Sequence, residues 1–432
     1  MTRTAEPAPP AAPGGPLLTR EAALVSAAFA AVVTALVLST LALGDAMPML
    51  ERDFKVYVVS GQAVLDGASP FDVSTDAGLL FIYSPFAALL FVPIALLNTH
   101  LAFALWTFAS TFALTACTWL LLGLATPLAP NKRTGFALLA SVAALGTAPV
   151  WPMVFNGQIN LLLMLVILVD LLRGPSRHRG VAIGLAAGIK LTPLIFVPYL
   201  LLTGRARAAA VATGTFLTTV LVGYLVLPGP SGQWLSGLVL DTTRMMPPDH
   251  GPWNESLRGV LGQLPGVLHA PWFGVAVTVL VGLAGLAVAV RATRRGQVAG
   301  GVLACAVTGT LVSPVSWPHH WVWVVPGAAA WLWWALRHGR AGHARAALAT
   351  WAVMIVSGVV MLLDDSPVAD LVVNVISLSE AGLFALNVLP VLGGMALLVA
   401  LALPARRPAG PAPDPAPEPV PDTPAQRPLL ER

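Results

Sequence analysis

The chain has 432 residues, of which 56% are hydrophobic and only 10% are charged, and its formal net charge is +4. Soluble domains carry roughly 25% charged residues, so this composition excludes a soluble globular protein. The basic residues occur as short clusters between long apolar runs, which is the pattern of membrane-protein loops and not of a protein that binds nucleic acid.

The two ends of the chain lack the apolar residues needed to fold. Residues 1–20, rich in proline and alanine, and residues 404–432, rich in proline, are both predicted to be disordered cytoplasmic tails. Residues 21–403 contain continuous apolar runs near the length of about 20 residues that a transmembrane helix needs. Continuous rather than alternating runs exclude a transmembrane β-barrel. The sequence therefore predicts an all-α polytopic integral membrane protein with roughly 10–12 transmembrane helices, some of them broken.

Two of the apolar runs are interrupted by residues that disfavour a continuous span. Prolines lie in the run at 79–97, and a lysine and a proline lie in the middle of the run at 180–202. If every run crosses the membrane, some basic clusters fall outside, whereas all clusters are cytoplasmic if these two runs do not cross fully. Both topologies give a multi-pass protein of the cell membrane with cytoplasmic termini. Both also leave the loop around Asp53, residues 228–270 and residues 313–320 outside.

The first polar cluster follows the first apolar run and reads Glu-Arg-Asp-Phe-Lys-Val-Tyr over residues 51–57. Charged residues beside a membrane span need a physical reason. Asp53, on the outer lip of a helix bundle, can accept a proton from an incoming hydroxyl. Arg52 and Tyr57 lie beside it as candidate substrate-binding residues. The alternative is that the carboxylate caps a solvated helix end.

Two uncharged polar motifs follow along the chain. Tyr83 lies in the motif Ile-Tyr-Ser-Pro-Phe, and Asn156, Gln158 and Asn160 lie in the motif Asn-Gly-Gln-Ile-Asn. Amide groups both donate and accept hydrogen bonds, which suits a ligand rich in hydroxyl groups. An ordinary turn explains the second motif equally well.

Lys190 lies well inside an apolar run, in the motif Gly-Ile-Lys-Leu-Thr-Pro. A cation within a membrane span is energetically expensive and by default indicates a functional site. Snorkelling to an interface is the alternative, but roughly ten apolar residues separate the lysine from either end of the run. Pairing with an anion such as a lipid phosphate is therefore favoured.

Adjacent histidines occur among tryptophans at residues 313–321. Because neighbouring residues on a helix point about 100° apart, His319 and His320 cannot form the i, i+4 pair of a helical zinc site. Both cysteines of the chain lie within apolar runs, so no metal or cofactor is predicted. The imidazoles and Trp317 can bind a phosphate or stack on a sugar. Anchoring in the aromatic belt of a membrane is the alternative.

In chain order, five segments resemble the motifs of glycosyltransferase family 87, which has the GT-C fold. They are Asp-Phe-Lys-Val-Tyr from Asp53, Tyr-Ser-Pro-Phe from Tyr83, Asn-Gly-Gln-Ile-Asn, Gly-Ile-Lys-Leu-Thr-Pro and Ser-Trp-Pro-His-His. The resemblance implies a GT-C-like bundle with its catalytic loops outside the cell. It also implies that Asp53 is the catalytic base, and that Lys190, His319 and His320 surround the donor phosphate.

The same resemblance implies the substrates. The donor is a polyprenyl-phosphate sugar, usually polyprenyl-phosphomannose, and the acceptor is a glycolipid or lipoglycan of the phosphatidylinositol-mannoside or lipomannan type, reached among membrane lipids. A single displacement, assisted by Lys190 and a protonated histidine at the departing phosphate, would invert the anomeric centre and give an α-mannoside, with an α-1,2 linkage favoured. Around Asp53 there is no Asp-x-Asp motif that would indicate a bridging metal.

Two other functions are weighed against this one. Within the family, an arabinofuranosyltransferase would use polyprenyl-phosphoarabinose in place of the mannose donor. Outside it, a secondary transporter or a lipid flippase can also contain broken helices around a polar site. The predicted polar residues lie mostly in outer loops rather than at the membrane midplane, which favours the enzyme.

Overall fold

The computed structural model describes residues 17–42, 50–125, 128–172, 176–246, 253–266, 270–364 and 380–402. Every regular element within these ranges is a helix, apart from an isolated bridge between Ser74 and Leu80. The predicted all-α class is confirmed. The tail predicted at residues 404–432 and nearly all of that at residues 1–20 lie outside the described residues.

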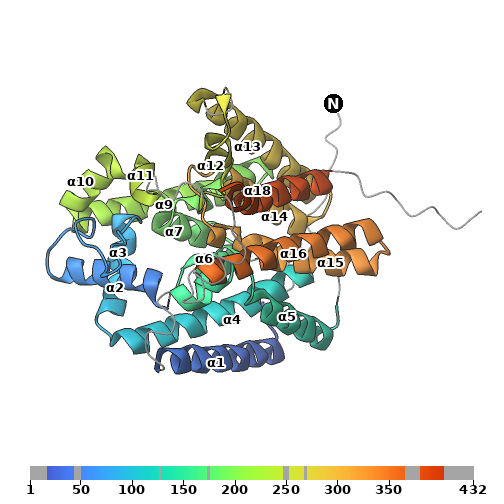
Figure 1. The fold of residues 1–432 in the computed structure, drawn as a ribbon, viewed down its shortest axis with the longest axis horizontal. Coiled ribbons are helices and arrows are strands. Elements are labelled where there is room, and N and C mark those ends of the chain that lie inside the picture. The colour runs from blue at the N-terminus through green and yellow to red at the C-terminus, as the bar shows by residue number, and fades with distance from the viewer. Residues whose placement is uncertain are drawn as a thin grey trace, which may run out of the picture. The chain divides into compact units, whose positions relative to one another are not determined.

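Four described helices are long and apolar enough to cross a membrane: α1 (Arg20–Ala42), α4 (Thr99–Ala125), α9 (Ala206–Val226) and α13 (Pro271–Arg294). In α4, 67% of the apolar window is buried, because α1 and α15 (Val324–Arg337) pack against it (Figure 1). The other three expose most of their apolar side chains. Such surfaces are stable in lipid rather than in water, so the chain is a polytopic membrane protein.

The remaining elements are mostly shorter helices and turns, together with two further long helices near the end of the described chain. Residues 50–202 add α2 (Arg52–Leu65), α3 (Pro85–Ala95), α5 (Pro130–Ala144), a π-helical turn (Pro152–Asn156), α6 (Asn160–Leu172), α7 (Val181–Ile189), a 3-10 turn (Thr192–Ile195) and α8 (Phe196–Leu202). Residues 228–402 add α10 (Pro228–Ser236), a 3-10 turn (Leu238–Leu240), α11 (Thr242–Met245), α12 (Leu257–Gly262), α14 (Val298–Val312), a 3-10 turn (Pro318–Trp323), α16 (Ala341–Asp364) and α18 (Glu380–Ala402).

The two runs predicted to be interrupted are broken in the structure. In the first, α3 has only 11 residues, and at about 1.5 Å per residue it is too short to span a hydrocarbon core of about 30 Å. In the second, α7 ends at Ile189 and the next residue, Lys190, has an extended backbone with φ −138° and ψ 131°. A 3-10 turn then begins at Thr192, with Pro193 as its second residue. The lysine therefore sits at a break between helices, where its backbone leaves the helical path.

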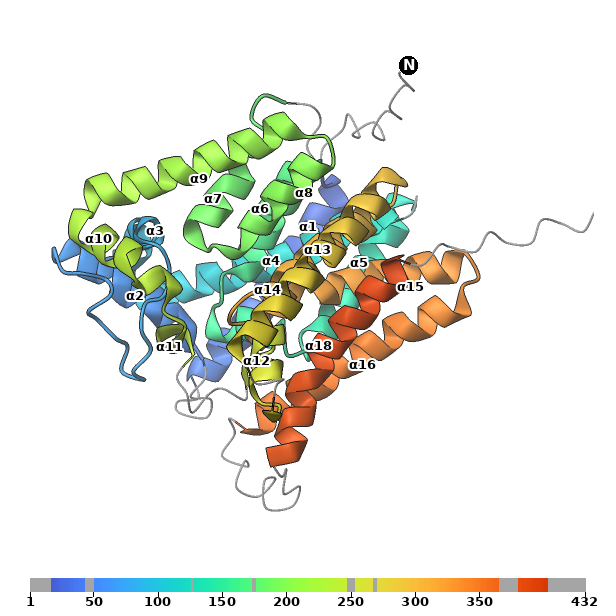
Figure 2. The same ribbon diagram turned by 90° about the horizontal axis from the view of Figure 1, so that it is seen from above.

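Glycines spaced four residues apart bring α7 against α9, and Figures 1 and 2 both show the two helices side by side. A Cβ at Gly180, Gly184 or Gly188 would collide with the backbone or a side chain of α9. Such small residues let two membrane helices approach closely. Because Lys190 directly follows α7, this packing fixes where the lysine enters the interior.

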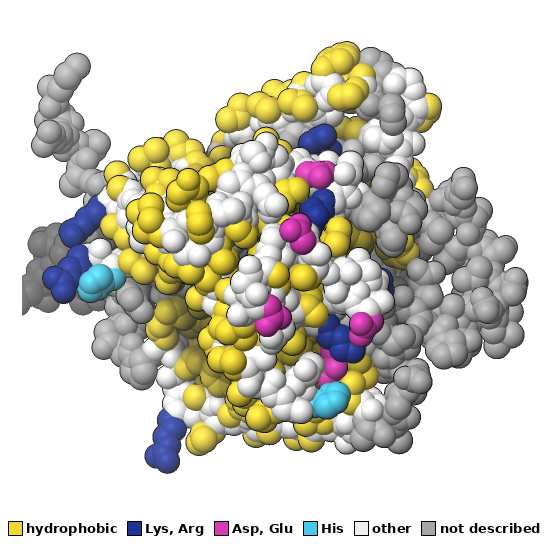
Figure 3. Space-filling view, turned by 90° about the vertical axis from the view of Figure 1, so that its left-hand side faces the viewer, with side chains coloured by type: hydrophobic (Ala, Val, Ile, Leu, Met, Phe, Trp, Pro, Cys, Tyr) yellow, Lys and Arg dark blue, Asp and Glu magenta, His cyan; other side chains and the backbone are white. Residues whose placement is uncertain are grey.

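Charged side chains gather on the face of the molecule that carries α2, α10 and α11 (Figure 3). Acidic groups there lie close to basic ones, whereas the neighbouring surface is mostly hydrophobic or uncharged. A polar band beside an apolar surface is what a protein presents where it leaves the membrane.

Candidate active site

A cavity of about 750 Å³ lies between segments that are far apart in the sequence. Its wall is formed by the start of α2, the loop before α3, the π-helical turn, the break after α7 and the segment that follows α14. All but one of the predicted site residues line it: Arg52, Asp53, Tyr57, Tyr83, Asn156, Gln158, Lys190, Trp317, His319 and His320. The exception is Asn160, which lies behind Lys190.

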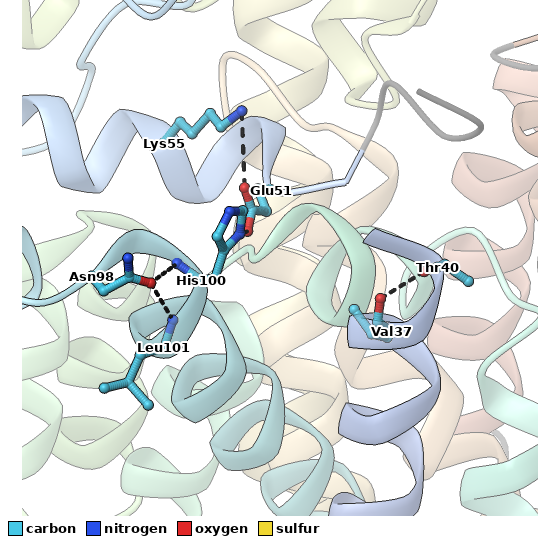
Figure 4. Close-up of polar contacts among 7 residues, drawn as sticks. All are labelled: Val37, Thr40, Glu51, Lys55, Asn98, His100 and Leu101. Atoms are coloured by element: carbon cyan, nitrogen blue, oxygen red, sulfur yellow. Dashed lines mark hydrogen bonds and ion pairs between the residues drawn. The ribbon is translucent and has the colours of Figure 1, made fainter. Parts of the chain in front are cut away.

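The position of Asp53 is set by an unusual turn at Glu51. Glu51 has a left-handed backbone with φ 61°, which is strained for a residue other than glycine. Its backbone N–H donates to the Phe155 carbonyl over 3.1 Å, and its buried carboxylate pairs with His100 at 3.0 Å and Lys55 at 3.9 Å (Figure 4). These contacts hold the turn, so that α2 starts at Arg52 and Asp53 falls in its first turn, facing the cavity.

Two amides hold the carboxylate of Asp53. Gln158 and Asn156 both donate side-chain hydrogen bonds to it. The Tyr83 hydroxyl donates to Oε1 of Gln158 over 3.3 Å, which directs the amide nitrogen of Gln158 toward Asp53. The hydroxyls of Tyr57 and Tyr83 lie 3.1 Å apart. Asp53 is therefore the end of a hydrogen-bonded chain that fixes its orientation.

The Gly157 backbone permits this arrangement. Gly157 has φ +82°, and a Cβ there would lie 2.6 Å from Cβ of Phe54, the neighbour of Asp53. We expect Gly157→Ala to lower the melting temperature and impair transfer, because a left-handed alanine costs about 1–2 kcal/mol and the contact displaces Phe54. Gly67→Ala is the matched control, since Gly67 has φ +71° with open space around it. Thermal unfolding and activity of the two purified variants would test this; equal losses would contradict it.

Lys190 is held by uncharged partners. Its ammonium group lies 3.1 Å from Oδ1 of Asn160 and 2.9 Å from Nε2 of His320, and 5.7 Å from the centroid of the Tyr83 ring. Asn160 in turn donates to the carbonyl of His319 over 3.1 Å. Within the described ranges, no carboxylate forms an ion pair with this lysine. The amine is therefore directed at the cavity, where the carboxylate of Asp53 acts on it without a direct ion pair.

The expectation of a protonated histidine does not fit this geometry. Nε2 of His320 faces the Lys190 ammonium, and Nδ1 faces the backbone N–H of Trp317 at 3.3 Å. A doubly protonated ring has no lone pair for either donor, whereas a neutral ring has one and can accept from one of the two. The contacts thus favour a neutral His320 that orients the lysine. The ring of His319 is nearly parallel to that of Trp317: their planes differ by 5° and their centroids lie 6.4 Å apart.

Comparison with known proteins identifies the family. Residues 81–314, over half of the chain, match the model of glycosyltransferase family 87. The chain belongs to glycosyltransferase family 87. The predicted family is confirmed. The match includes Tyr83, the Asn-Gly-Gln-Ile-Asn motif and Lys190, while Asp53 and the two histidines lie outside the matched residues.

Relatives of this family 87 protein come from mycobacteria. It is 35% identical over 287 residues to the polyprenol-phosphate-mannose-dependent alpha-(1-2)-phosphatidylinositol pentamannoside mannosyltransferase of Mycobacterium tuberculosis (strain CDC 1551 / Oshkosh), over 63% of this chain and 64% of the relative. It is 32% identical over 286 residues to a protein of the same name from Mycolicibacterium smegmatis, over 63% and 67%. The match thus spans about two thirds of these relatives. No solved structure matches the chain.

Burial in the family 87 cavity raises the pKa of the Asp53 carboxyl above its ordinary value of 3.8, and the hydrogen bond from Gln158 partly opposes this. Asp53 lies outside the four long apolar helices. A base must be ionised, so we expect transfer to fall, as the pH is lowered, at a higher pH than for an exposed aspartate. Gln158→Met removes a stabilising hydrogen bond and should move this acid limb to still higher pH. The rate of transfer by the wild-type protein and by Gln158→Met is measured against pH. If both rates fall at the same low pH, Asp53 is not the group whose ionisation limits transfer.

Arg244 is a cavity residue for which the sequence analysis predicts no role. It comes from the Asp-Thr-Thr-Arg segment of the loop at residues 228–270, which the sequence predicts to lie outside, and its guanidinium donates to the carbonyls of Phe71 and Phe81. Its only signal in the sequence is a charge in a predicted outer loop. No three His, Cys, Asp or Glu side chains in the described part of the chain gather closely enough to hold a metal ion.

Proposed function

We propose that this protein transfers a mannosyl residue from polyprenyl-phosphomannose to a mannose-containing glycolipid or lipoglycan. Its relatives are named as polyprenol-phosphate-mannose-dependent mannosyltransferases that act on phosphatidylinositol mannosides, which supports both substrates. The observation that carries the proposal is the pairing of Asp53 and Lys190 across one cavity. Such a transfer needs two groups, and the cavity offers both: a carboxylate oriented by two amides, and a lysine that forms no direct ion pair within the described residues.

The reaction follows from these positions. An acceptor hydroxyl attacks the anomeric carbon of the donor sugar and gives its proton to Asp53. The bond between the anomeric carbon and the phosphate oxygen breaks, and the electron pair leaves with polyprenyl phosphate. Lys190 stabilises the negative charge that grows on this phosphate. Because one displacement inverts the anomeric centre, a β-linked donor gives an α-mannoside, and the names of the relatives support an α-1,2 linkage.

The amides of the Asn-Gly-Gln-Ile-Asn motif serve this reaction by positioning. Asn156 and Gln158 orient the base, and Asn160 orients Lys190, so one short segment sets the separation of the two reacting sides. Oδ1 of Asn156 is buried without a hydrogen-bond partner in the structure. That oxygen is the part of the motif best placed to accept from a substrate hydroxyl.

The test uses purified full-length protein and a lipid acceptor extract. Polyprenyl-phosphomannose, polyprenyl-phosphoarabinose and a nucleotide sugar are supplied separately, and product masses are followed. We expect a hexose to be added only from the polyprenyl-phosphomannose. Addition of a pentose would make the protein an arabinofuranosyltransferase, and transfer from the nucleotide sugar alone would overturn the proposal. Movement of the donor lipid between leaflets without any product would instead indicate a flippase.

We also propose that the cavity opens on the outer face of the cell membrane and that both termini are cytoplasmic. Basic clusters at the opposite ends of the helices support this orientation. Both native cysteines are buried, so single cysteines introduced at exposed Asp76 and exposed Lys132 can be labelled selectively. In intact cells an impermeant thiol reagent should label position 76 and spare position 132; the opposite pattern would reverse the topology.

A further inference from the structure

A second hollow of about 480 Å³ adjoins the cavity. It is an open groove between the loop that precedes α3 and the segment from α10 to α11. Arg244 lines both the groove and the cavity, so the two hollows meet at this side chain. A ligand too long for the cavity can therefore extend past Arg244 into the groove.

Contacts between its two walls hold the groove open without a ligand. Ser69 donates to Oε1 of Gln233 over 3.1 Å, and the Arg244 guanidinium donates to two backbone carbonyls of the opposite wall. Oδ1 of Asp241 accepts from the backbone N–H groups of Thr243 at 3.0 Å and of Arg244 at 3.3 Å. A preformed site binds without the entropic cost of ordering its walls.

The chemistry of the groove differs from that of the cavity. Its polar side chains are the carboxylates of Asp72 and Asp241, the amide of Gln233, the hydroxyl of Ser236 and the edge of Arg244. Two carboxylates against one guanidinium make it net acidic, which disfavours a phosphate. The combination of fixed donors and acceptors suits hydroxyl groups, each of which both donates and accepts. The groove therefore fits a neutral, polyhydroxylated ligand.

We propose that this groove binds neutral sugar residues of the acceptor that lie beyond the residue whose hydroxyl faces Asp53. This inference rests on the proposed function. The donor carries a single sugar next to its phosphate, and an apolar lipid tail gains nothing from carboxylates and amides, so neither part of the donor fits the groove. An acceptor that is a chain of sugars supplies the extended neutral ligand. The groove then determines how long an acceptor the enzyme prefers.

The experiment compares Asp72→Ala and Gln233→Ala with Asp76→Ala, a control in the same loop that does not line the groove. At saturating donor, we expect the groove variants to raise KM for a multi-mannose glycolipid about fivefold to tenfold, as for the loss of a hydrogen bond. KM for a single-mannose acceptor and for the donor should not change. Equal effects on short and long acceptors, a raised donor KM, or an effect of Asp76→Ala would overturn the proposal.

A second measurement separates this proposal from the proposed function. Binding of free mannotriose to the intact protein is followed by ligand-observed NMR, with inorganic phosphate as the anionic comparison. Wild-type protein should bind mannotriose, and the groove variants should bind it about fivefold to tenfold more weakly. If no donor supports transfer but this pattern holds, the reaction fails and the sugar groove stands. Binding that is unaltered in the groove variants would remove the groove from the site.

Discussion

Replacing Asp53 by Asn is expected to reduce sugar transfer by about 10²–10⁴-fold while leaving the fold and donor binding intact. The amide has the shape of the carboxylate but cannot accept the proton of the attacking hydroxyl. Gln158 can still donate to the remaining oxygen. Asn156 can turn its amide to accept from the new amide group, because its own Oδ1 has no hydrogen-bond partner. The loss should therefore be one of catalysis, with little loss of stability.

Three variants make this test specific. Asp53→Glu keeps a carboxylate but moves it by one methylene, and misplacement of that size costs about 100-fold. Asp66→Asn, at an exposed position just after α2, is the control and should transfer at the wild-type rate. Melting temperature and donor affinity are measured beside the initial rate. Wild-type transfer by purified Asp53→Asn would remove Asp53 as the base.

Lys190→Ala is expected to weaken donor binding much more than acceptor binding. Without the ammonium group the lipid phosphate enters a poorly solvated cavity unpaired, which costs about 2–5 kcal/mol by comparison with buried charge pairs. Asn160 and His320 also lose the partner that both contact. The rate of the chemical step should fall as well, since the charge on the leaving phosphate is stabilised less.

The measurement is a pair of KM values, one with donor varied and one with acceptor varied. Lys132→Ala, an exposed lysine at the start of α5, serves as the control for loss of a positive charge. Only the donor KM of Lys190→Ala should rise. A raised acceptor KM with an unchanged donor KM would mean that the lysine binds the acceptor instead.

The fold class followed from the sequence because apolar runs and helix-breaking residues are local signals. The break at Lys190 was visible as a charge and a proline within one run, and the structure places the end of α7 there. The predicted count of roughly 10–12 spans counted apolar windows. The structure divides the window at residues 180–202 into α7 and α8, of 9 and 7 residues, because tertiary packing and not window length sets where a helix ends.

The sequence predicted which residues form the site, but not which residues they contact. Polar side chains stand out in an apolar chain, so ten of the eleven predicted residues line the cavity. Their partners depend on segments that are distant in sequence, as for Lys190 and His320 or Tyr83 and Gln158. Asn160 was expected to contact substrate and instead holds the lysine, a difference that no local pattern encodes. The left-handed turn at Glu51 likewise depends on His100, which comes from the start of α4.

The most direct measurement is a structure of the Asp53→Asn variant with polyprenyl-phosphomannose bound, since this variant should hold the donor without turning it over. We expect the donor phosphate to lie about 3 Å from Nζ of Lys190. The anomeric carbon should face position 53 across the space that an acceptor hydroxyl would occupy. A phosphate bound away from Lys190, or a sugar directed out of the cavity, would show that Asp53 and Lys190 do not act together on the donor.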